Sequence, residues 1–526
     1  IQYRHSDNEL SLGVGGNRRM VIDTNSRISL SNNDSGGTTG TDSTSGNTLF
    51  GYLAGSSIQD TGIDNTYIGH KAGASTTTGD NNTAIGARAL FNITTAGQSV
   101  AVGEQAGYST TDHGNNIFIG CQAGYYQKGE SNVFIGKDAG LGAVGSNNDG
   151  TVAIGYQSLY TLTSGEFNTA VGYQTLKNAT GQRNSVLGYQ ALFSTTVAGN
   201  SVAVGRQAGY SVTDHGNNVF IGDIAGYHQT GESNVFIGKD AGLGASGADG
   251  DNNTAIGKSA GASLTSGSNN TIVGRLTADA LTTGSSNIVI GDSALGTATT
   301  ATLNVAIGGD CMSLVPASVA IQDVVAIGQN AFKGASGTTT GANGTVALGR
   351  DSLKALTTGS KNVAIGYKAG ETYNGNNSVI IGYEAGLNMD TTGTNASNSI
   401  LIGVEAGKEL DDGSFNVAIG EEAMKSNSGG GNSAIRNVCI GYRAGTLLRT
   451  GSDNVVIGHG ASISATNAVN QIAIGKEVIG VADNSVTLGN ADVTDVYMAQ
   501  DSGATVHCAG VNFPDSQVAS SDVNTL

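Results

Sequence analysis

Residues 100–142 read VAVGEQAGYSTTDHGNNIFIGCQAGYYQKGESNVFIGKDAGLG, and residues 202–244 repeat this stretch nearly unchanged as VAVGRQAGYSVTDHGNNVFIGDIAGYHQTGESNVFIGKDAGLG. In the first copy an apolar–x–apolar–Gly tetrapeptide ends at Gly103, Gly120 and Gly136. The offset of 102 residues between the copies equals six steps of 17. Such regularity predicts a structure in which one short unit is stacked many times, each unit contacting mainly its neighbours.

The same tetrapeptide recurs along nearly the whole chain, with successive Gly residues mostly 16 or 17 positions apart and occasional insertions to 19–21. This unit is too short for a strand–helix pair, and the apolar residues show no 3.6-residue period. We therefore expect an all-β chain, a repetitive parallel β-solenoid (β-roll) with 16–17-residue coils stacked about 4.8 Å apart. Glycines expected at coil corners, where φ is positive, include Gly86, Gly103, Gly120, Gly136, Gly205, Gly222, Gly238 and Gly366.

Two further positions of the unit are nearly constant. Asn usually precedes the corner Gly by four residues, and Ala usually follows it by three, as at Ala106 and Ala123. Stacked Asn side chains can form a hydrogen-bonded ladder, and the small Ala predicts a narrow interior. The predicted Asn ladder includes Asn82, Asn116, Asn132, Asn218 and Asn234.

Both faces of the short strand are apolar. Residues one and three before the corner Gly, such as Ile135 and Val133, share one face, which we expect to point into the coil. The residue between them is also apolar, and a thin coil can cover only one face. We expect this second face to pack on other copies around an axis, as a homotrimer, through Phe118, Phe134, Phe220 and Phe236. A monomeric solenoid with a sandwich cross-section is the alternative.

The composition excludes several classes of protein. The chain has 82 Gly but only 2 Pro, so it is not collagen-like. It carries 25 Lys+Arg against 42 Asp+Glu, a net charge of −17, and shows no basic face for nucleic acid. The sequence contains no run of about 18 apolar residues, so it predicts no membrane-spanning helix. The four cysteines lack the CxxC spacing of a zinc site.

The chain divides into three expected regions. Residues 1–48 are an N-terminal β-hairpin attachment region, because apolar residues alternate around the turn Gly15-Gly16-Asn17. Residues 49–490 form the β-solenoid repeat shaft. Residues 491–526 are a C-terminal β-hairpin cap and tail, with a turn at Asp501-Ser502-Gly503.

No motif predicts a catalytic, cofactor-binding or metal site. His113 and His215, each beside an Asp in the duplicated loop, could meet near a trimer axis and bind a metal, but a solvated loop is the simpler interpretation. The acidic stretches 248–252 and 411–412 could hold Ca²⁺ but lack the spacing of a calcium loop. Cys121 and Cys439 occupy repeat positions and are expected to act as small apolar side chains.

Tyrosine recurs at two positions of the unit. Such stripes could stack on sugars, although a ring ladder that shields the coil edge is the favoured interpretation. The tyrosines concerned are Tyr156, Tyr173, Tyr189, Tyr367, Tyr383 and Tyr442 after the corner Gly, and Tyr108, Tyr125, Tyr210 and Tyr227 after Ala-Gly.

The pattern Asn-Ser/Thr-Val/Ala-Ala/Val-Ile-Gly-x-x-Ala, over about residues 49–490, resembles the β-roll repeats in the heads of trimeric autotransporter adhesins. It is more similar still to bacteriophage tail-fibre proteins with longer coils of this kind. The adhesin repeat is nearer 14 residues, a spacing found here only between Gly475 and Gly489. The N-terminal segment Arg19-Met20-Val21-Ile22-Asp23 resembles one that precedes such repeats in phage fibres.

The resemblance implies a non-enzymatic homotrimeric fibre or shaft of a phage tail or similar extracellular appendage, a rigid spacer for host attachment. The alternative is a bacterial surface adhesin whose lateral loops bind a glycan or protein receptor. A depolymerase is disfavoured, because such enzymes place paired carboxylates in a groove on a wider helix. These functions would place the chain in a virion tail or on an extracellular surface.

Overall fold

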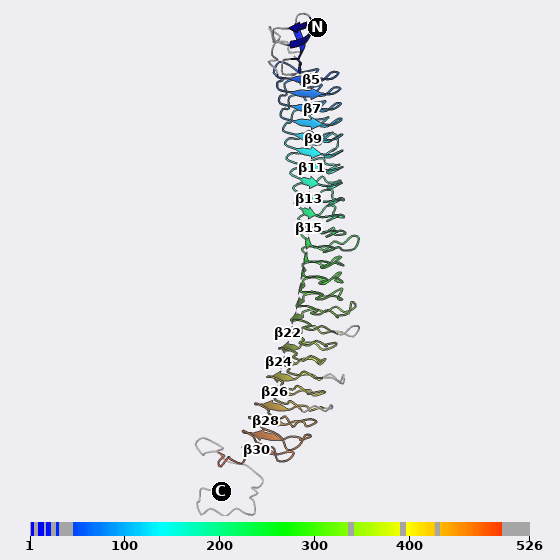
Figure 1. The fold of residues 1–526 in the computed structure, drawn as a ribbon. Helices are drawn as coiled ribbons and strands as arrows, with labels where there is room; N and C mark the ends of the chain where they lie inside the picture. Colours follow the sequence, from blue (N-terminus) through cyan, green and yellow to red (C-terminus); the bar gives the residue numbers. More distant parts are fainter. Residues whose placement is uncertain are drawn as a thin grey trace, which may run out of the picture.

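The computed structural model describes residues 2–4, 9–14, 17–22, 28–30, 46–334, 341–389, 396–426 and 432–496. Figure 1 shows a slender, gently bent rod in which one short strand per coil forms a continuous edge and the connecting turns project to the other side. The described residues contain strands and turns but no helix. The chain is therefore all-β, as the sequence predicted.

The N-terminal strands form a separate antiparallel sheet. Its strands are β1 (Gln2–Arg4), β2 (Glu9–Val14), β3 (Asn17–Ile22) and β4 (Ile28–Leu30), paired in chain order. The antiparallel pairing of β2 with β3 confirms the hairpin expected around Gly15-Gly16-Asn17. Most of the expected C-terminal hairpin, residues 497–526, lies outside the described residues.

Twenty-six strands, β5 to β30, form the solenoid, each three residues long. They are β5 (Thr48–Phe50), β6 (Thr66–Ile68), β7 (Thr83–Ile85), β8 (Val100–Val102), β9 (Ile117–Ile119), β10 (Val133–Ile135), β11 (Val152–Ile154), β12 (Thr169–Val171), β13 (Ser185–Leu187), β14 (Val202–Val204), β15 (Val219–Ile221), β16 (Val235–Ile237), β17 (Thr254–Ile256), β18 (Thr271–Val273), β19 (Ile288–Ile290), β20 (Val305–Ile307), β21 (Val325–Ile327), β22 (Val346–Leu348), β23 (Val363–Ile365), β24 (Val379–Ile381), β25 (Ile400–Ile402), β26 (Val417–Ile419), β27 (Val438–Ile440), β28 (Val455–Ile457), β29 (Ile472–Ile474) and β30 (Val486–Leu488).

Each solenoid strand pairs in parallel with the strand of the next coil, without any shift of register. Ala101 of β8 lies beside Phe118 of β9, which in turn lies beside Phe134 of β10. Equivalent residues of successive coils therefore form columns along the rod. At about 4.8 Å per coil, the stack is on the order of 120 Å long. The parallel β-solenoid with coils of about 17 residues is confirmed.

The two strand faces are the reverse of the expectation. Phe118, Phe134, Phe220 and Phe236 have no exposed surface within the single chain, so they form the interior of the coil and cannot be an intersubunit face. The flanking residues point outward instead, as Ile119 does with 38% of its surface exposed. The physical reason is width: a narrow coil has room for one inward side chain per strand, and Ala, the most frequent residue there, fills that place in twelve of the twenty-six strands.

The interior is filled by residues of complementary size. Where the strand contributes a large side chain such as Phe134, the residue four after the corner is Gly140, and a Cβ added there would lie 2.6 Å from the Phe134 ring. In the next coil the strand contributes Ala153, and the corresponding position is Leu159, which is fully buried. Where both positions are small, as with Ala101 and Gly107, the large side chains Leu90 and Phe118 of the neighbouring coils fill the space, so the interior stays closely packed.

The corner glycines are required by both conformation and space. The eight predicted corners have φ between 131° and 143°, a region closed to other residues. A Cβ on Gly86 or Gly136 would also lie 2.5 Å from the carbonyl oxygen of the next corner glycine. Corner glycines therefore allow the coils to stack at β-sheet spacing.

Exchanging the sizes of one interior pair tests this packing. We expect Phe134→Ala to destabilise its coil by about 3–5 kcal/mol through a cavity, and Gly140→Leu to destabilise it by a clash with the Phe134 ring. The double variant recreates the Ala153–Leu159 arrangement, in which Leu159 has a φ of 51°, so it should recover most of the loss. Hydrogen exchange over residues 133–160 measures the local opening free energy. Additive losses would contradict the pairing.

A corner substitution should differ from one on the open surface. Gly238→Val places a β-branched residue at a φ of 135° and a Cβ 2.6 Å from the Gly257 carbonyl carbon. The strain alone costs about 1–3 kcal/mol, so amide protection should fall in the coils of β16 and β17. At Gly309 φ is not positive and an added Cβ meets no other group, so Gly309→Ser should leave protection unchanged. If Gly238→Val and Gly309→Ser changed amide protection equally, the corner glycines would have no special role.

Candidate functional site

The outward face of the solenoid sheet is an apolar stripe, defined by the residues one and three before each corner Gly. Ile256, Ile288 and Ile290 are 37–44% exposed, and the equivalents in other coils are half-buried or exposed. Because the strands are in register, these side chains form two columns along the rod: the column next to the corner Gly is apolar in every coil, whereas the other carries Thr or Ser in seven coils. A contiguous apolar surface of this length is unusual on a monomer and marks an interaction surface.

The predicted Asn ladder lies inside the coil, beside the strand. Asn82, Asn116, Asn132, Asn218 and Asn234 are fully buried. Their oxygens accept hydrogen bonds from the same position of the next coil, as Asn116 Oδ1 does from the Asn132 amide at 3.0 Å. Their Nδ2 groups donate to backbone carbonyls, as Asn82 does to Ala96 at 2.9 Å. The predicted ladder is present, and it works mainly by binding backbone groups rather than by pairing side chains.

Aromatic rings form stacked columns at both tyrosine positions. Tyr156, Tyr173 and Tyr189 have ring centroids 5.2 and 5.3 Å apart. At the second position, Tyr108 and Tyr125 are 4.8 Å apart and nearly parallel. The rings stack on one another along the axis, as the ladder interpretation predicts, yet Tyr173 and Tyr189 remain 44% and 47% exposed.

Charged side chains form a ladder that the sequence analysis missed. Lys408 binds Glu405, which lies three residues earlier in the same coil, at 2.7 Å and Glu384 of the preceding coil at 2.5 Å. Partial burial works against the charged ammonium, but these two carboxylates hold the pKa of Lys408 above its usual value. The alternation continues along the axis through Lys425, Glu422 and Arg443. The stacking of coils completes the ladder, because the pairs of Lys408 with Glu384, Lys425 with Glu405 and Arg443 with Glu422 each join neighbouring coils.

The duplicated Asp–His loops do not gather into a larger group. His113 Nδ1 lies 3.3 Å from Asp112 Oδ1, and His215 Nδ1 lies 3.5 Å from Asp214 Oδ1, with all four side chains well exposed. In the acidic stretch 248–252, Asp251 accepts a hydrogen bond from the Glu232 amide. Over the described ranges, no group of three His, Cys, Asp or Glu side chains could hold a metal ion.

Two of the described cysteines are interior residues. Cys311 and Cys439 are fully buried and form no disulfide, and Cys439 occupies the inward strand position, where it packs as a small apolar side chain. Burial raises the pKa of the Cys311 thiol to about 12 and also raises the pKa of Cys439. Both thiols are therefore protonated at neutral pH. Cys121 is half-buried and free. Cys508 lies outside the described residues.

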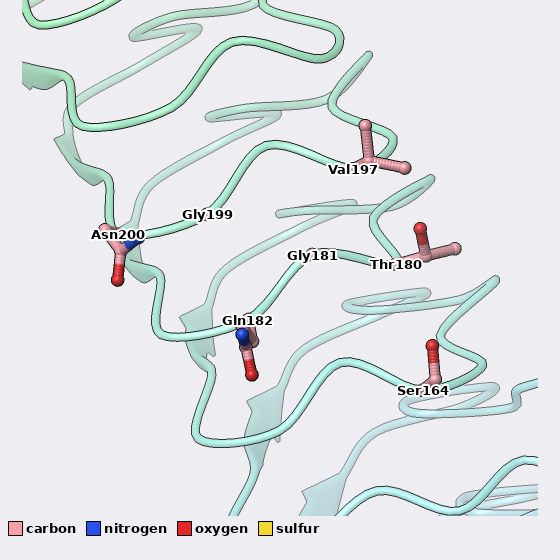
Figure 2. Close-up of a pocket in the computed structure, with 7 residues that line it drawn as sticks. All are labelled: Ser164, Thr180, Gly181, Gln182, Val197, Gly199 and Asn200. Carbon is pink, nitrogen blue, oxygen red and sulfur yellow. The ribbon is translucent and has the colours of Figure 1, made fainter.

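A shallow polar groove of about 380 Å³ crosses the coils that follow β11, β12 and β13. Figure 2 shows Ser164, Thr180 and Val197 in one column at the outer turn, with Gln182 and Asn200 nearer the strands. Gly181 and Gly199 complete the lining, which contains no charged side chain. Such a groove offers hydroxyl, amide and backbone groups for a neutral polar ligand.

No protein-family model matches this chain, and no curated protein matches it in sequence. Within the part of the chain that the structure describes, no helix has the length and hydrophobicity needed to cross a membrane. The surface features above therefore carry the functional argument.

Removing one Asn tests the ladder. Asn234 accepts from the Asn253 amide and donates to the Gly250 carbonyl, both at 2.9 Å. Asn234→Leu leaves the buried Asn253 amide and Gly250 carbonyl without hydrogen-bond partners. Each unpaired group should lower stability by about 1–3 kcal/mol, so hydrogen exchange should accelerate around residues 234–253. Asn234→Ser should lose less, because Ser99 accepts the equivalent bond in another coil.

Asn92→Ala is the control for this change, since the Asn92 side chain lies at the surface, outside the ladder. Hydrogen exchange that stays the same in Asn234→Leu and Asn92→Ala would show that the ladder does not stabilise the coils.

Proposed function

We propose that this chain is a non-enzymatic structural shaft of a phage tail fibre or a similar extracellular appendage, a rigid spacer that holds a binding tip away from its base. The observation that carries the proposal is the unbroken stack of twenty-six in-register strands. A rod on the order of 120 Å built from one repeated coil spans distance with little sequence complexity.

Rigidity follows from the number of ladders that join each coil to the next. Strand hydrogen bonds, the buried Asn ladder and backbone bonds in the turns all run along the axis, for example from the Leu90 amide to the Ala106 carbonyl at 2.9 Å. Stacked rings and the charged ladder add contacts at the surface. Bending the rod would strain all of these sets at once.

Self-association is the second part of the proposal, and it uses the outward face of the solenoid sheet. A strand of three residues is about 10 Å long, so the apolar stripe covers on the order of 1,000 Å² over the whole stack. A stable interface buries about 800 Å² on each partner. Three such stripes around one axis would form a shared dry core of Ile and Val, and the resemblance to trimeric repeats favours three copies.

The alternative function is adhesion through the lateral turns. It is supported by the grooves between coils, because they lie among polar side chains on the turns rather than on the sheet face. A shaft can also carry such sites, so the two functions are compatible.

Charge placed on the sheet face should prevent association. We expect the wild-type chain to have three times its 52.6 kDa mass in analytical ultracentrifugation. The triple variant Ile256→Lys, Val273→Lys and Ile290→Lys should sediment as a folded monomer, because each ammonium would enter a dry layer at a cost of several kcal/mol. Circular dichroism checks that the strands persist.

The matched control carries the same added charges on exposed turn residues of neighbouring coils, as Ser266→Lys, Thr283→Lys and Thr300→Lys. This protein should remain trimeric. A wild-type chain of 52.6 kDa, or a sheet-face variant that still assembles, would overturn the proposed association.

A further inference from the structure

We propose that a groove on the turns that follow β6 to β10 binds a carboxylate-bearing sugar of the uronic acid type. Its volume is about 440 Å³, within the range of small-molecule sites. Two columns of polar side chains form its walls, an aromatic ring and a lysine stand at one end, and a loop insertion overhangs that end. The site does not depend on the shaft function or on the oligomeric state.

The first wall is the column Ser75, Asn92, Ser109 and Tyr126, one residue from each of four successive coils. Backbone hydrogen bonds hold these coils in register, from the Asn92 amide to the Tyr108 carbonyl at 3.1 Å and from the Ser109 amide to the Tyr125 carbonyl at 2.9 Å. Ser75, Asn92 and Ser109 thus present two hydroxyls and an amide at about the spacing of the coils. Hydroxyl-rich ligands such as sugars bind through groups of this kind.

The second wall is the column Thr94, Thr111 and Lys128. The Thr94 hydroxyl donates to the Thr111 carbonyl at 3.1 Å, which orients this wall. The nearby Asp112 carboxylate accepts from the Thr111 hydroxyl and lies beside His113. Lys128 is exposed, and no carboxylate of the described residues lies within 4.0 Å of its ammonium. It is the only charged residue that lines the groove.

The end of the groove is shaped by a ring and by an insertion. The Tyr126 ring packs edge-on against Tyr125, with centroids 4.5 Å apart, and this contact orients it. The following coil is longer than most, and its loop residues Val144 and Gly145 line the groove. The amide of Lys128 donates to the Ser146 carbonyl at 2.9 Å, which ties this loop to the lysine.

This set of groups matches one ligand chemistry. A tyrosine ring offers an apolar face to the C–H groups of a pyranose, hydroxyls and an amide bind its hydroxyls, and one ammonium binds one carboxylate through a charge-assisted hydrogen bond. A nucleic acid would need many cations, whereas this chain has a net charge of −17. One isolated lysine among neutral donors therefore favours an acidic sugar.

If copies of the chain associate through their sheet faces, the groove remains accessible. Thr180 belongs to the same column position as Thr94 and Thr111, eight residues after its corner Gly. Figure 2 shows Thr180 at the outer turn, away from the strands. The column that contains Lys128 thus lies on the side of the coil opposite the apolar stripe.

The duplicated block supplies a natural comparison. His228 takes the place of Tyr126 and Thr230 that of Lys128. The His228 ring still packs edge-on against Tyr227, with centroids 4.6 Å apart. The second block therefore keeps the scaffold but lacks both the tyrosine face and the cation, and we expect it not to bind the acidic sugar.

The test is isothermal titration calorimetry of the full chain with tetragalacturonate, and with its fully methyl-esterified form as a neutral probe of equal size. We expect one site per chain for the acid, and binding of the ester that is weaker by about tenfold, since a charge-assisted hydrogen bond is lost. Lys128→Thr and Tyr126→His, which copy the second block, should each weaken binding of the acid by about tenfold.

The reciprocal double variant His228→Tyr and Thr230→Lys should add a second site for the acid. Absence of binding to the wild type at millimolar concentration, or unchanged binding in Lys128→Thr, would overturn the proposal. So would an oligoglutamate peptide that binds as tightly as the sugar, because it would show a simple anion patch. Ultracentrifugation of the same samples keeps this result separate from the trimer proposal.

Discussion

The distance between one corner glycine and the next is the constraint on which the structure depends. A Cβ on Gly86 would lie 2.5 Å from the carbonyl oxygen of Gly103, so even alanine at the corner would force the coils apart. With glycine there, the chain turns at a φ of 134° and the strands approach to hydrogen-bonding distance. Every other ladder, whether of Asn, aromatic or charged side chains, exists because equivalent residues then recur at that one spacing.

The interior and the surface are specified by different kinds of signal. Inside, a large side chain from one position is accommodated by a small residue at the other, as Phe134 with Gly140 and Ala153 with Leu159 show. Outside, the sheet face carries Ile and Val, and the turns carry hydroxyls, amides and charges. The rod therefore has an apolar side, which the proposed self-association uses, and a polar side, which the proposed sugar site uses.

Much of this fold could be predicted from the sequence because the repeat is short and its special residues are few. Gly120 and Asn132 stand out because they recur at fixed positions of the repeat. The role of Gly120 follows from the positive φ of the corner, and that of Asn132 from the buried backbone groups that need hydrogen-bond partners. The direction of the strand faces could not be obtained from alternation, because Ile119 and Phe118 are both apolar. Frequent Ala at the central strand position was the available signal for the inside. The grooves and the pair of Lys408 with Glu384 depend on contacts between coils, which no single repeat contains.

The strands run across the rod, and this has a mechanical consequence. Tension applied at the two ends acts along the hydrogen bonds between coils and breaks them one layer at a time. Compression along the axis presses the layers together. Each layer that opens releases about 17 residues, or roughly 55–60 Å of extended chain, in exchange for about 4.8 Å of stacked height. A rod of this design resists compression and lengthens stepwise under tension, so it absorbs work before it breaks.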